Sequence, residues 1–376
     1  MKKIAILGAS EPHLPLFLKA KEMGLETYCF AWSQGAYCKN YADHYYDISI
    51  VDKEQIAVIC QKEKINGIIS NALEIAVPTA AYVAELLDLN GIPYEVALNA
   101  RNKFQMREKV SHQKACQQPT YTLYQSGYLP SFYPVIVKPI DGSCSNGVTK
   151  VNKREDLTQA LNRASQASLA NCILIEEYIE GKEVSVESIS FHSKHYVLTI
   201  TDKETTGAPY FVETAHHQPS TLSLDIQEKL KYATCNILNA IGINNGASHT
   251  EFKIDQNGNI FFIEVGARGG GDFISYDLVK LSTGYDYVKG MIEVALGEFN
   301  IPKWSFHKCS GVYFLSKEVS YIRAFIENNK NAEWAVKYHI DKGPLQELKK
   351  SQDRSGYIIY QACLLYTSDA ADEEDS

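Results

Sequence analysis

The first 97 residues alternate short apolar runs with helical stretches, and this alternation restricts the fold more than any other feature of the sequence. Strand patterns occupy residues 3–7, 26–31, 45–48 and 67–70, and helical patterns occupy 14–23, 53–63 and 77–87. Strands that are joined through helices pair in parallel, and the helices then cover both faces of the sheet. We therefore expect a Rossmann-like domain over residues 1–97.

The turn after the first strand argues against a dinucleotide site in this domain. It reads Gly8-Ala-Ser-Glu-Pro12 and holds a single glycine, whereas the dinucleotide fingerprint is G-x-G-x-x-G. Open parallel sheets still bind small molecules at the carboxyl ends of their strands. Ser10, Glu11 and Glu74 lie at such ends, so they are either substrate contacts or ordinary polar loop residues.

The pattern changes near residue 133, where strands joined by short turns replace the alternation. Apolar runs at 134–140 and 148–151 flank a loop of small residues, and runs at 249–254 and 259–265 flank Asp255-Gln-Asn-Gly258. Asn-Gly between two alternating runs is a strong hairpin signal. We expect an α+β region here, distinct from the first domain.

Bulk composition limits the class of protein. Of 376 residues, 45% are hydrophobic and 22% are charged, which is ordinary for a globular chain. The net charge of −8 comes without a basic run, so we expect no nucleic-acid partner. No apolar run reaches membrane-spanning length, and the N-terminal run is too short for a signal peptide, which predicts a cytoplasmic protein. Nine scattered cysteines without zinc spacing predict reduced thiols.

The last residues differ sharply in composition from the rest. Residues 363–376, CLLYTSDAADEEDS, carry five acidic residues and no base. They resemble the translation of a sequencing adapter, so we expect a non-native acidic tail, with an incomplete region at 306–362 before it. The alternative is a natural, disordered acidic tail.

The loop Asp141-Gly-Ser-Cys-Ser-Asn-Gly147 is the first candidate for phosphate binding. A P-loop places its lysine after the glycines and continues into a helix, whereas Lys138 precedes this loop and a strand follows it. The loop is therefore either a plain hairpin turn or a glycine-rich hairpin that folds over a triphosphate with its backbone N–H groups. In the second case Lys138 reaches the phosphates as a point charge.

Three acidic positions further along the chain strengthen the second interpretation. Glu183 follows the extended segment 175–181 and can accept from ribose hydroxyls. Glu251 and Glu264 stand on the two arms of the predicted hairpin, seven residues before and six after Gly258, so the arms bring them level. Two carboxylates on a mostly apolar face repel unless a cation joins them, and a hard cation such as Mg²⁺ fits. The alternative is two surface acids.

Two basic residues complete the pattern. Arg268 lies four residues after Glu264 in a glycine-rich segment, where it can pair with a γ-phosphate or a substrate carboxylate. Lys103 is a second candidate phosphate ligand on a helix expected from Asn102 to about Gln113. Each residue alone has a plain structural explanation, as a solvated arginine or lysine.

Taken in order, these residues resemble the ATP-grasp superfamily over roughly residues 1–300, in its carboxylate–amine ligase branch, which includes L-amino-acid ligases, carbamoyl-phosphate synthase large subunits and biotin carboxylase. The matching motifs are N-K-x-x-M-R (102–107), V-K-P (137–139), G-S-x-S-x-G-V (142–148), E-E-Y-I-x-G (176–181), S-V-E (185–187), E-F (251–252) and E-x-x-x-R (264–268). The resemblance implies an ATP-grasp domain of two α+β subdomains over 98–305, with a lid subdomain at about 114–180, after the Rossmann-like domain.

The resemblance also implies a role for each matching residue. ATP would be held by Lys103, Lys138, Gly142, Ser143, Ser145, Gly147, Glu176, Glu177, Ile179 and Glu183. Glu177 and Ile179 would meet the adenine through their backbone, and Glu183 would bind the ribose. Glu251 and Glu264 would bind Mg²⁺ or Mn²⁺. Lys138 and Arg268 would be catalytic, with Arg268 at the acyl phosphate.

Substrate contacts are implied at Glu187, His217 and Arg268. The segment from Glu213 to Pro219 resembles the E-x-x-x-H-x-x-P segment of some amino-acid ligases, which is the reason for His217. One departure stands out. The family usually has asparagine as a further metal ligand two residues after the second glutamate, and Gly266 occupies that position here.

The implied activity is an ADP-forming carbon–nitrogen ligase that takes small carboxylate and amine substrates and is compatible with a homodimer. Two alternatives stay open. One is another kind of ATP-grasp enzyme, biotin-carboxylase-like or acting on a nucleotide precursor. The other is a non-catalytic ATP-binding or sensing module, for which Gly266 is the motivating departure.

Overall fold

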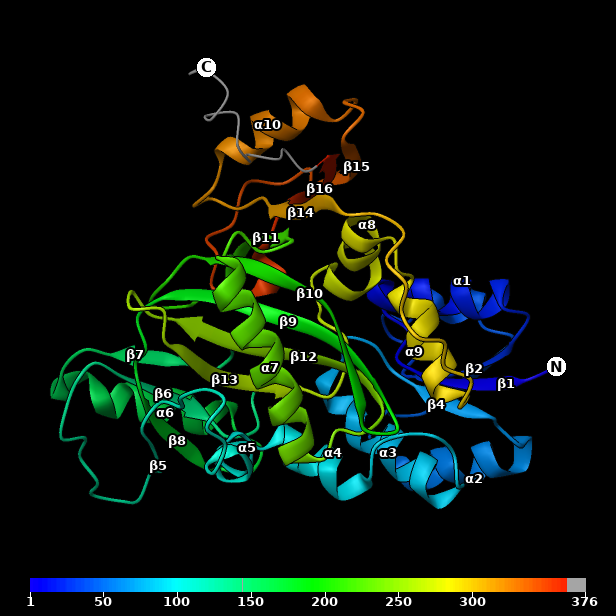
Figure 1. Cartoon of the computed structure of the whole chain (residues 1–376), viewed down its shortest axis with the longest axis horizontal. Helices are drawn as coiled ribbons and strands as arrows, with labels where there is room; N and C mark the ends of the chain where they lie inside the picture. Colours follow the sequence, from blue (N-terminus) through cyan, green and yellow to red (C-terminus); the bar gives the residue numbers. More distant parts are fainter. Residues whose placement is uncertain (144, 364–376) are drawn as a thin grey trace, which may run out of the picture.

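A computed structural model describes residues 1–143 and 145–363 of the chain, and in these residues three sheets form the framework. Figure 1 shows the N-terminal sheet in blue at the right, a small sheet in teal at the lower left, and a large curved sheet that runs from green in the centre to orange and red at the top. The expected combination of a Rossmann-like unit and an ATP-grasp fold is confirmed.

The N-terminal sheet is parallel throughout, as the alternation predicts. Its strands, in spatial order, are β3 (His44–Asp47), β2 (Glu26–Ala31), β1 (Lys3–Leu7) and β4 (Gly67–Ile69). The helices of this unit are α1 (Leu14–Glu22), α2 (Lys53–Glu63) and α3 (Val77–Leu86). Asp52 caps α2 by accepting from the Gln55 backbone N–H, a side-chain bond that satisfies an otherwise orphan donor.

Two short helices lead from this unit to the small sheet. They are α4 (Tyr94–Arg101) and α5 (Lys103–Val110), and Asn102 caps α5 with its side chain. The small antiparallel sheet consists of β5 (Tyr121–Leu123), β8 (Ile173–Glu177), β6 (Val135–Pro139) and β7 (Thr149–Val151). Helix α6 (Leu157–Ala167) packs Leu157 and Ala160 against Val135 and Ile175 of the small sheet, and these residues form the core of this subdomain.

The large sheet has eight strands, and every neighbouring pair is antiparallel. Its order is β13 (Ile260–Gly266), β12 (Gly246–Ile254), β9 (Lys182–Phe191), β10 (Lys194–Thr205), β11 (Glu213–Gln218), β14 (Lys308–Phe314), β16 (Gly356–Cys363) and β15 (Ala335–Ile340). The predicted hairpin at Asn257-Gly258 joins β12 to β13. The long helix α7 (Leu224–Ile241) lies across this sheet (Figure 1).

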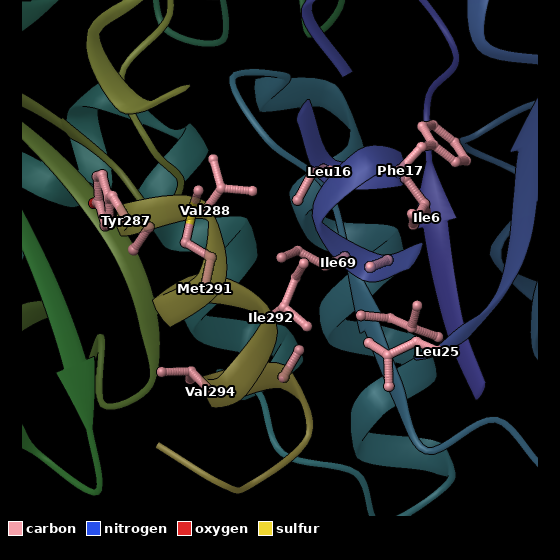
Figure 2. Packing of buried hydrophobic residues seen from close by; sticks show 14 of the residues in the cluster. Ile6, Leu16, Phe17, Leu25, Ile69, Tyr287, Val288, Met291, Ile292 and Val294 are labelled. Atoms are coloured by element: carbon pink, nitrogen blue, oxygen red, sulfur yellow. The ribbon is translucent and has the colours of Figure 1, made fainter. Parts of the chain in front are cut away.

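The remaining helices are α8 (Val279–Thr283), α9 (Tyr287–Ala295) and α10 (Tyr321–Asn329). Helix α9 fixes the N-terminal unit to the large sheet. Figure 2 shows Ile292 of α9 next to Ile69 of β4, with Met291 of α9 and Leu16 of α1 in the same apolar cluster. Burial of this cluster holds the end of β4 at a defined place relative to the large sheet.

The C-terminal strands bear on two of the predicted boundaries. Strands β14, β15 and β16 extend the large sheet across the predicted boundary at residues 305 and 306, so the region 306–362 shares a sheet with residues before it. Cys363, which was predicted to open the tail, instead ends β16 and pairs with Lys308. The other residues of the predicted tail, 364–376, lie outside the described residues. Among the described residues, no helix combines the length and the apolar character that a membrane crossing requires.

Candidate active site

The loop between β6 and β7 is shaped by its two glycines. A Cβ on Gly142 would lie 2.6 Å from Pro139 Cγ, and Gly147 has φ +78° with a Cβ position 2.6 Å from Ala167. Ser145 also adopts a positive φ, 54°. A side chain at either glycine would therefore displace the loop from the end of β6. The predicted loop residue Cys144 lies outside the described residues.

This loop borders a cavity that we call the loop cavity, which encloses about 840 Å³ of empty space, part of it open to solvent. Nearly all of the predicted ATP-binding residues line it: Lys103, Lys138, Gly142, Ser143, Ser145, Glu176, Glu177, Ile179 and Glu183. Gly147 is the exception, because it packs against α6 and Pro139 instead. Glu251 and Glu264 stand at the border of the same cavity. The structure thus brings together residues that are up to 161 positions apart, from 103 to 264.

Lys138 is held in the loop cavity by a buried ion triad. Its ammonium lies 2.5 Å from one oxygen of Glu176, and Arg107 Nε lies 2.7 Å from the other. Burial opposes ionisation of this carboxyl, but Arg107 and Lys138 outweigh it and lower the pKa of Glu176 to about 2. Glu176 is therefore a carboxylate that orients Lys138, and its carboxyl group is already occupied before any ligand binds.

Lys103 lines the same cavity from the start of α5. Its Nζ donates to the Gly142 carbonyl at 2.7 Å and lies 3.0 Å from Glu264 Oε2. Burial disfavours the charged ammonium, yet Glu264, Glu74 and Glu251 together raise the pKa of Lys103. This lysine thus links the loop to one of the two predicted metal ligands.

Glu251 and Glu264 are direct partners across the β12–β13 hairpin, as the spacing predicted. Glu251 accepts from Lys203 at 2.6 Å, and Lys203 also lies 3.3 Å from Glu183 and 3.5 Å from Glu213. Burial opposes ionisation, but Lys203 and His249 hold the pKa of Glu251 well below its usual range. Two adjacent carboxylates, each neutralised by a lysine, are thus present where a cation was predicted.

A second cavity, which we call the interdomain cavity, lies between the N-terminal unit and the large sheet and encloses about 1430 Å³. The residues that line both cavities are Lys103, Gly142, Ser143, Ser145, Glu183, Glu251 and Glu264, so the two cavities meet along the loop and at the paired glutamates. Its other walls come from the N-terminal unit, from the segment after β13, from β11 and from the C-terminal region: Ser10, Asn71, Glu74, His216, Arg268, Asp272, Ser351 and Gln352.

Arg268 lines the interdomain cavity and is held by the N-terminal unit. Its Nε donates to Glu74 Oε2 at 3.0 Å, and its Nη1 donates to the Gly269 carbonyl at 3.0 Å. Of the strand-end residues considered in the sequence, Ser10 and Glu74 line this cavity and Glu11 does not. Arg268 thereby faces the space next to the paired glutamates.

Glu187 does not occupy the position expected of a substrate contact. Its side chain is fully buried, and it accepts from the Gly270 backbone N–H at 3.2 Å and pairs with His249. It lines neither cavity. Burial opposes protonation, but Glu187 and Glu251 raise the pKa of His249 to about 9. Glu187 therefore contacts His249, which itself lines the interdomain cavity, and its assignment to substrate stays a prediction.

His217 is likewise displaced from the expected place. Its ring contacts Tyr360 Oη at 2.8 Å and Glu204 at 3.1 Å, outside the residues that line the two cavities. The preceding His216 points the other way, as neighbours on a strand do, and lines the interdomain cavity near Asp272. The spacing H-x-x-P before Pro219 is satisfied by His216 and not by His217, which lies only two residues before the proline, so this spacing could have identified His216.

Other site residues escaped the sequence reasoning for a physical reason. Lys203 and Asp272 belong to no motif, and Arg354, which lies 2.8 Å from Asp272, comes from the C-terminal region. Burial opposes ionisation, but Arg354 and His216 lower the pKa of Asp272. Arg107 could have been identified from the sequence, because it is the last residue of the motif N-K-x-x-M-R.

Comparison with known proteins identifies the class. Residues 131–277 match the family described as "ATP-grasp domain", so this chain contains an ATP-grasp domain. This match confirms the resemblance seen in the motifs, and it supports the predicted use of ATP.

The relatives narrow the class to ligases. The chain is 25% identical over 352 residues to an alanine–anticapsin ligase of Bacillus subtilis, with 81% of this chain and 72% of the relative covered. It is 28% identical over 239 residues to a D-alanine–D-alanine ligase of Trichlorobacter lovleyi, with 60% and 75% covered. The crystal structure of an L-amino acid ligase from Bacillus licheniformis superimposes with a TM-score of 0.80 at 23% identity, over 97% of this chain and 94% of that one. The prediction of an ATP-grasp ligase is confirmed at the level of this class.

Proposed function

We propose that this protein is an ADP-forming ligase that activates a carboxylate as an acyl phosphate and joins it to an amine or ammonia. The observation that carries the proposal is the pairing of Glu251 with Glu264 at the point where the two cavities meet. A nucleotide in the loop cavity would present its terminal phosphate there, next to a substrate in the interdomain cavity. Curated relatives named as amino-acid ligases support the same reaction class.

In this proposal the loop cavity holds ATP. Lys138 and Lys103 bind phosphate oxygens, the backbone at Gly142, Ser143 and Ser145 covers them, and Glu183 accepts from the ribose. Glu176 keeps Lys138 pointed into the cavity, and Arg107 shares that carboxylate. The nucleotide thus enters a site whose cations are already oriented, which lowers the reorganisation that binding costs.

The donor set of the paired glutamates fits Mg²⁺ or Mn²⁺. Both groups are carboxylates, which hard divalent cations prefer, and both lie against basic residues that a cation could replace as the counter-charge. Among the described residues, no three His, Cys, Asp or Glu side chains already form a metal cluster, so Glu251 and Glu264 would have to turn from their lysines toward the ion. When bound, the ion would offset charge on the transferring phosphoryl group.

Two displacements make up the reaction. An oxygen of the substrate carboxylate attacks the γ-phosphorus, the bond from that phosphorus to the bridging oxygen breaks, and ADP leaves with the electron pair. The amine nitrogen then attacks the acyl carbon, loses a proton, and inorganic phosphate leaves. Arg268 stands on the substrate side and is placed to offset charge on the acyl phosphate. The loop excludes water, since water would hydrolyse this intermediate.

ADP release from the full chain under three substrate pools tests the proposal. We expect pooled L-amino acids to stimulate ADP and phosphate release and to yield a condensed product by mass spectrometry. Stimulation by bicarbonate or by nucleotide precursors alone would favour the other ATP-grasp enzymes, and nucleotide binding without stimulation by any pool would favour a sensing module. We place the reaction in the cytoplasm with small-molecule substrates, and we retain the homodimer as a prediction for size measurement.

A further inference from the structure

Gly266 occupies a position where the backbone does not demand glycine. It ends β13, two residues after Glu264, and it is absent from the residues with a positive φ. The space around it is the reason for glycine. A Cβ at this position would lie 2.9 Å from Glu74 Oε2 and 3.3 Å from Arg268 Nε. The side chain missing at Gly266 thus leaves room that the carboxylate of Glu74 fills from the N-terminal unit.

One oxygen of Glu74 is left without a partner. Oε2 accepts from Arg268, whereas Oε1 is buried and has no hydrogen-bond partner among the described residues. A buried, unsatisfied carboxylate oxygen is costly, and in a binding site it indicates a group that arrives with the ligand. Because a carboxylate oxygen only accepts, the missing group is a cation or a donor.

The neighbours of Glu74 favour a cation. Glu74, Glu251 and Glu264 line the same cavity, and Glu74 Oε2 reaches the strand that carries Glu264, 2.9 Å from the Cβ position of Gly266. Lys103, Lys203 and Arg268 each hold one of these carboxylates, but the contact from Arg268 is to Oε2 of Glu74 and leaves Oε1 unmatched within the described residues. A divalent cation between the carboxylates would fill that place, because carboxylate oxygens are the ligands it prefers.

The segment that leads to Glu74 is fixed by contacts just before it in the chain. Asn71 is fully buried and its side chain exchanges hydrogen bonds with the Ser275 hydroxyl at 3.0 and 3.1 Å, which ties the loop after β4 to the segment after β13. The cluster around α9 in Figure 2 holds β4 itself against the large sheet. The backbone leading to Glu74 is thus tied to the segment after β13, and Arg268 holds the Glu74 carboxylate itself.

We propose that Glu74 supplies a carboxylate ligand to the divalent cation from the N-terminal unit, in place of the side chain that Gly266 lacks. Oε2 stays with Arg268 and Oε1 binds the ion, so one carboxylate joins the ion to the arginine on the substrate side. This inference rests on the proposed function, because the ion is the one that accompanies ATP.

Binding of Mn²⁺, measured by electron paramagnetic resonance with a non-hydrolysable ATP analogue, tests it without turnover. The variants are Glu74→Gln, Glu74→Ala, Gly266→Asn, the double variant Glu74→Ala with Gly266→Asn, and Glu264→Gln as the reference for loss of a ligand. We expect Glu74→Gln and Glu74→Ala to weaken nucleotide-dependent Mn²⁺ binding by about tenfold or more. We expect the double variant to recover most of that loss, because removing Glu74 frees the space for an asparagine side chain.

The outcomes separate this inference from the function on which it rests. If Glu264→Gln loses Mn²⁺ while both Glu74 variants bind it as the wild type does, Glu74 only positions Arg268 and the inference fails alone. If the wild type binds no Mn²⁺ with nucleotide, the proposed function fails and the inference with it. Glu74→Gln keeps an acceptor for Arg268, so its loss of Mn²⁺ binding would distinguish a metal ligand from a positioning residue.

Discussion

The loop cavity and the interdomain cavity share a border but are built in different ways. The loop cavity is lined by α5, the small sheet and the paired strands β12 and β13, and its charged groups are already matched, as in the triad of Lys138, Glu176 and Arg107. The interdomain cavity draws on the N-terminal unit, β11 and the C-terminal region, and its Glu74 oxygen is unmatched. A cavity whose charged groups are already paired, like the loop cavity, suits a ligand that does not vary. A cavity built from several segments, like the interdomain cavity, can accept another substrate when one of those segments changes.

Substitutions at the shared border of the two cavities should reduce activity more than substitutions elsewhere in either cavity. Glu264→Gln keeps the shape of the side chain but removes the charge that faces Lys103 and the cation. We expect ADP release to fall by roughly a thousandfold, the size of effect seen when one preorganised electrostatic group is removed. The exposed Glu180→Gln is the matched control and should be close to wild type. Equal turnover in the two variants would refute the metal assignment.

The ion triad in the loop cavity should contribute to the free energy of unfolding. Arg107→Met leaves Glu176 buried with Lys138 as its remaining partner, and breaking a buried ion pair costs about 3–5 kcal/mol. Urea unfolding measures the loss. Lys109→Met, on the exposed face of the same helix, should change the free energy of unfolding little. A loss in the Lys109 variant as large as in the Arg107 variant would mean that the helix, and not the triad, is responsible.

Acid should weaken the same triad. The folded pKa of Glu176, about 2, lies below its ordinary value of 4.5, so the triad contributes its full stability above pH 4.5 and loses it as the pH falls toward 2. The loss attributable to Glu176 is up to about 3 kcal/mol. Unfolding free energies at pH 5 and pH 3 should therefore differ more for the wild type than for Glu176→Gln. Parallel pH profiles would contradict the lowered pKa.

Substitution of the adjacent residues His216 and His217 should have the smallest effect on catalysis. It compares a residue that lines the interdomain cavity with a neighbour that does not. We expect His216→Gln to lower kcat/KM for the carboxylate or amine substrate by about tenfold, equivalent to about 1.4 kcal/mol, because His216 lines the interdomain cavity. We expect His217→Gln to leave kcat/KM within about twofold and to affect only stability, through the lost contact with Tyr360. A larger kinetic effect at His217 would restore its original assignment.

The same contrast explains what could be predicted from sequence. The loop cavity follows from motifs in which spacing along a strand or hairpin fixes geometry, so Glu251 and Glu264 could be paired from their distances to Gly258 alone. The interdomain cavity depends on contacts between distant segments, such as Glu74 with Arg268 and Arg354 with Asp272, which leave no periodic trace. His217 was chosen over His216 although neighbouring positions on a strand point to opposite faces. Glu187 shares a face with Glu183 and Glu251, but His249 and the Gly270 backbone cover it, which its motif does not reveal.

The continuity of the large sheet from β13 to β15 has a practical consequence for handling this protein. Strand β11 carries His216, and its outer neighbour β14 is contributed by residues after 305. A fragment cut at that point would expose the backbone hydrogen-bonding edge of β11, and bare strand edges pair with one another between molecules. We therefore expect such a fragment to precipitate rather than to behave as a minimal catalytic unit.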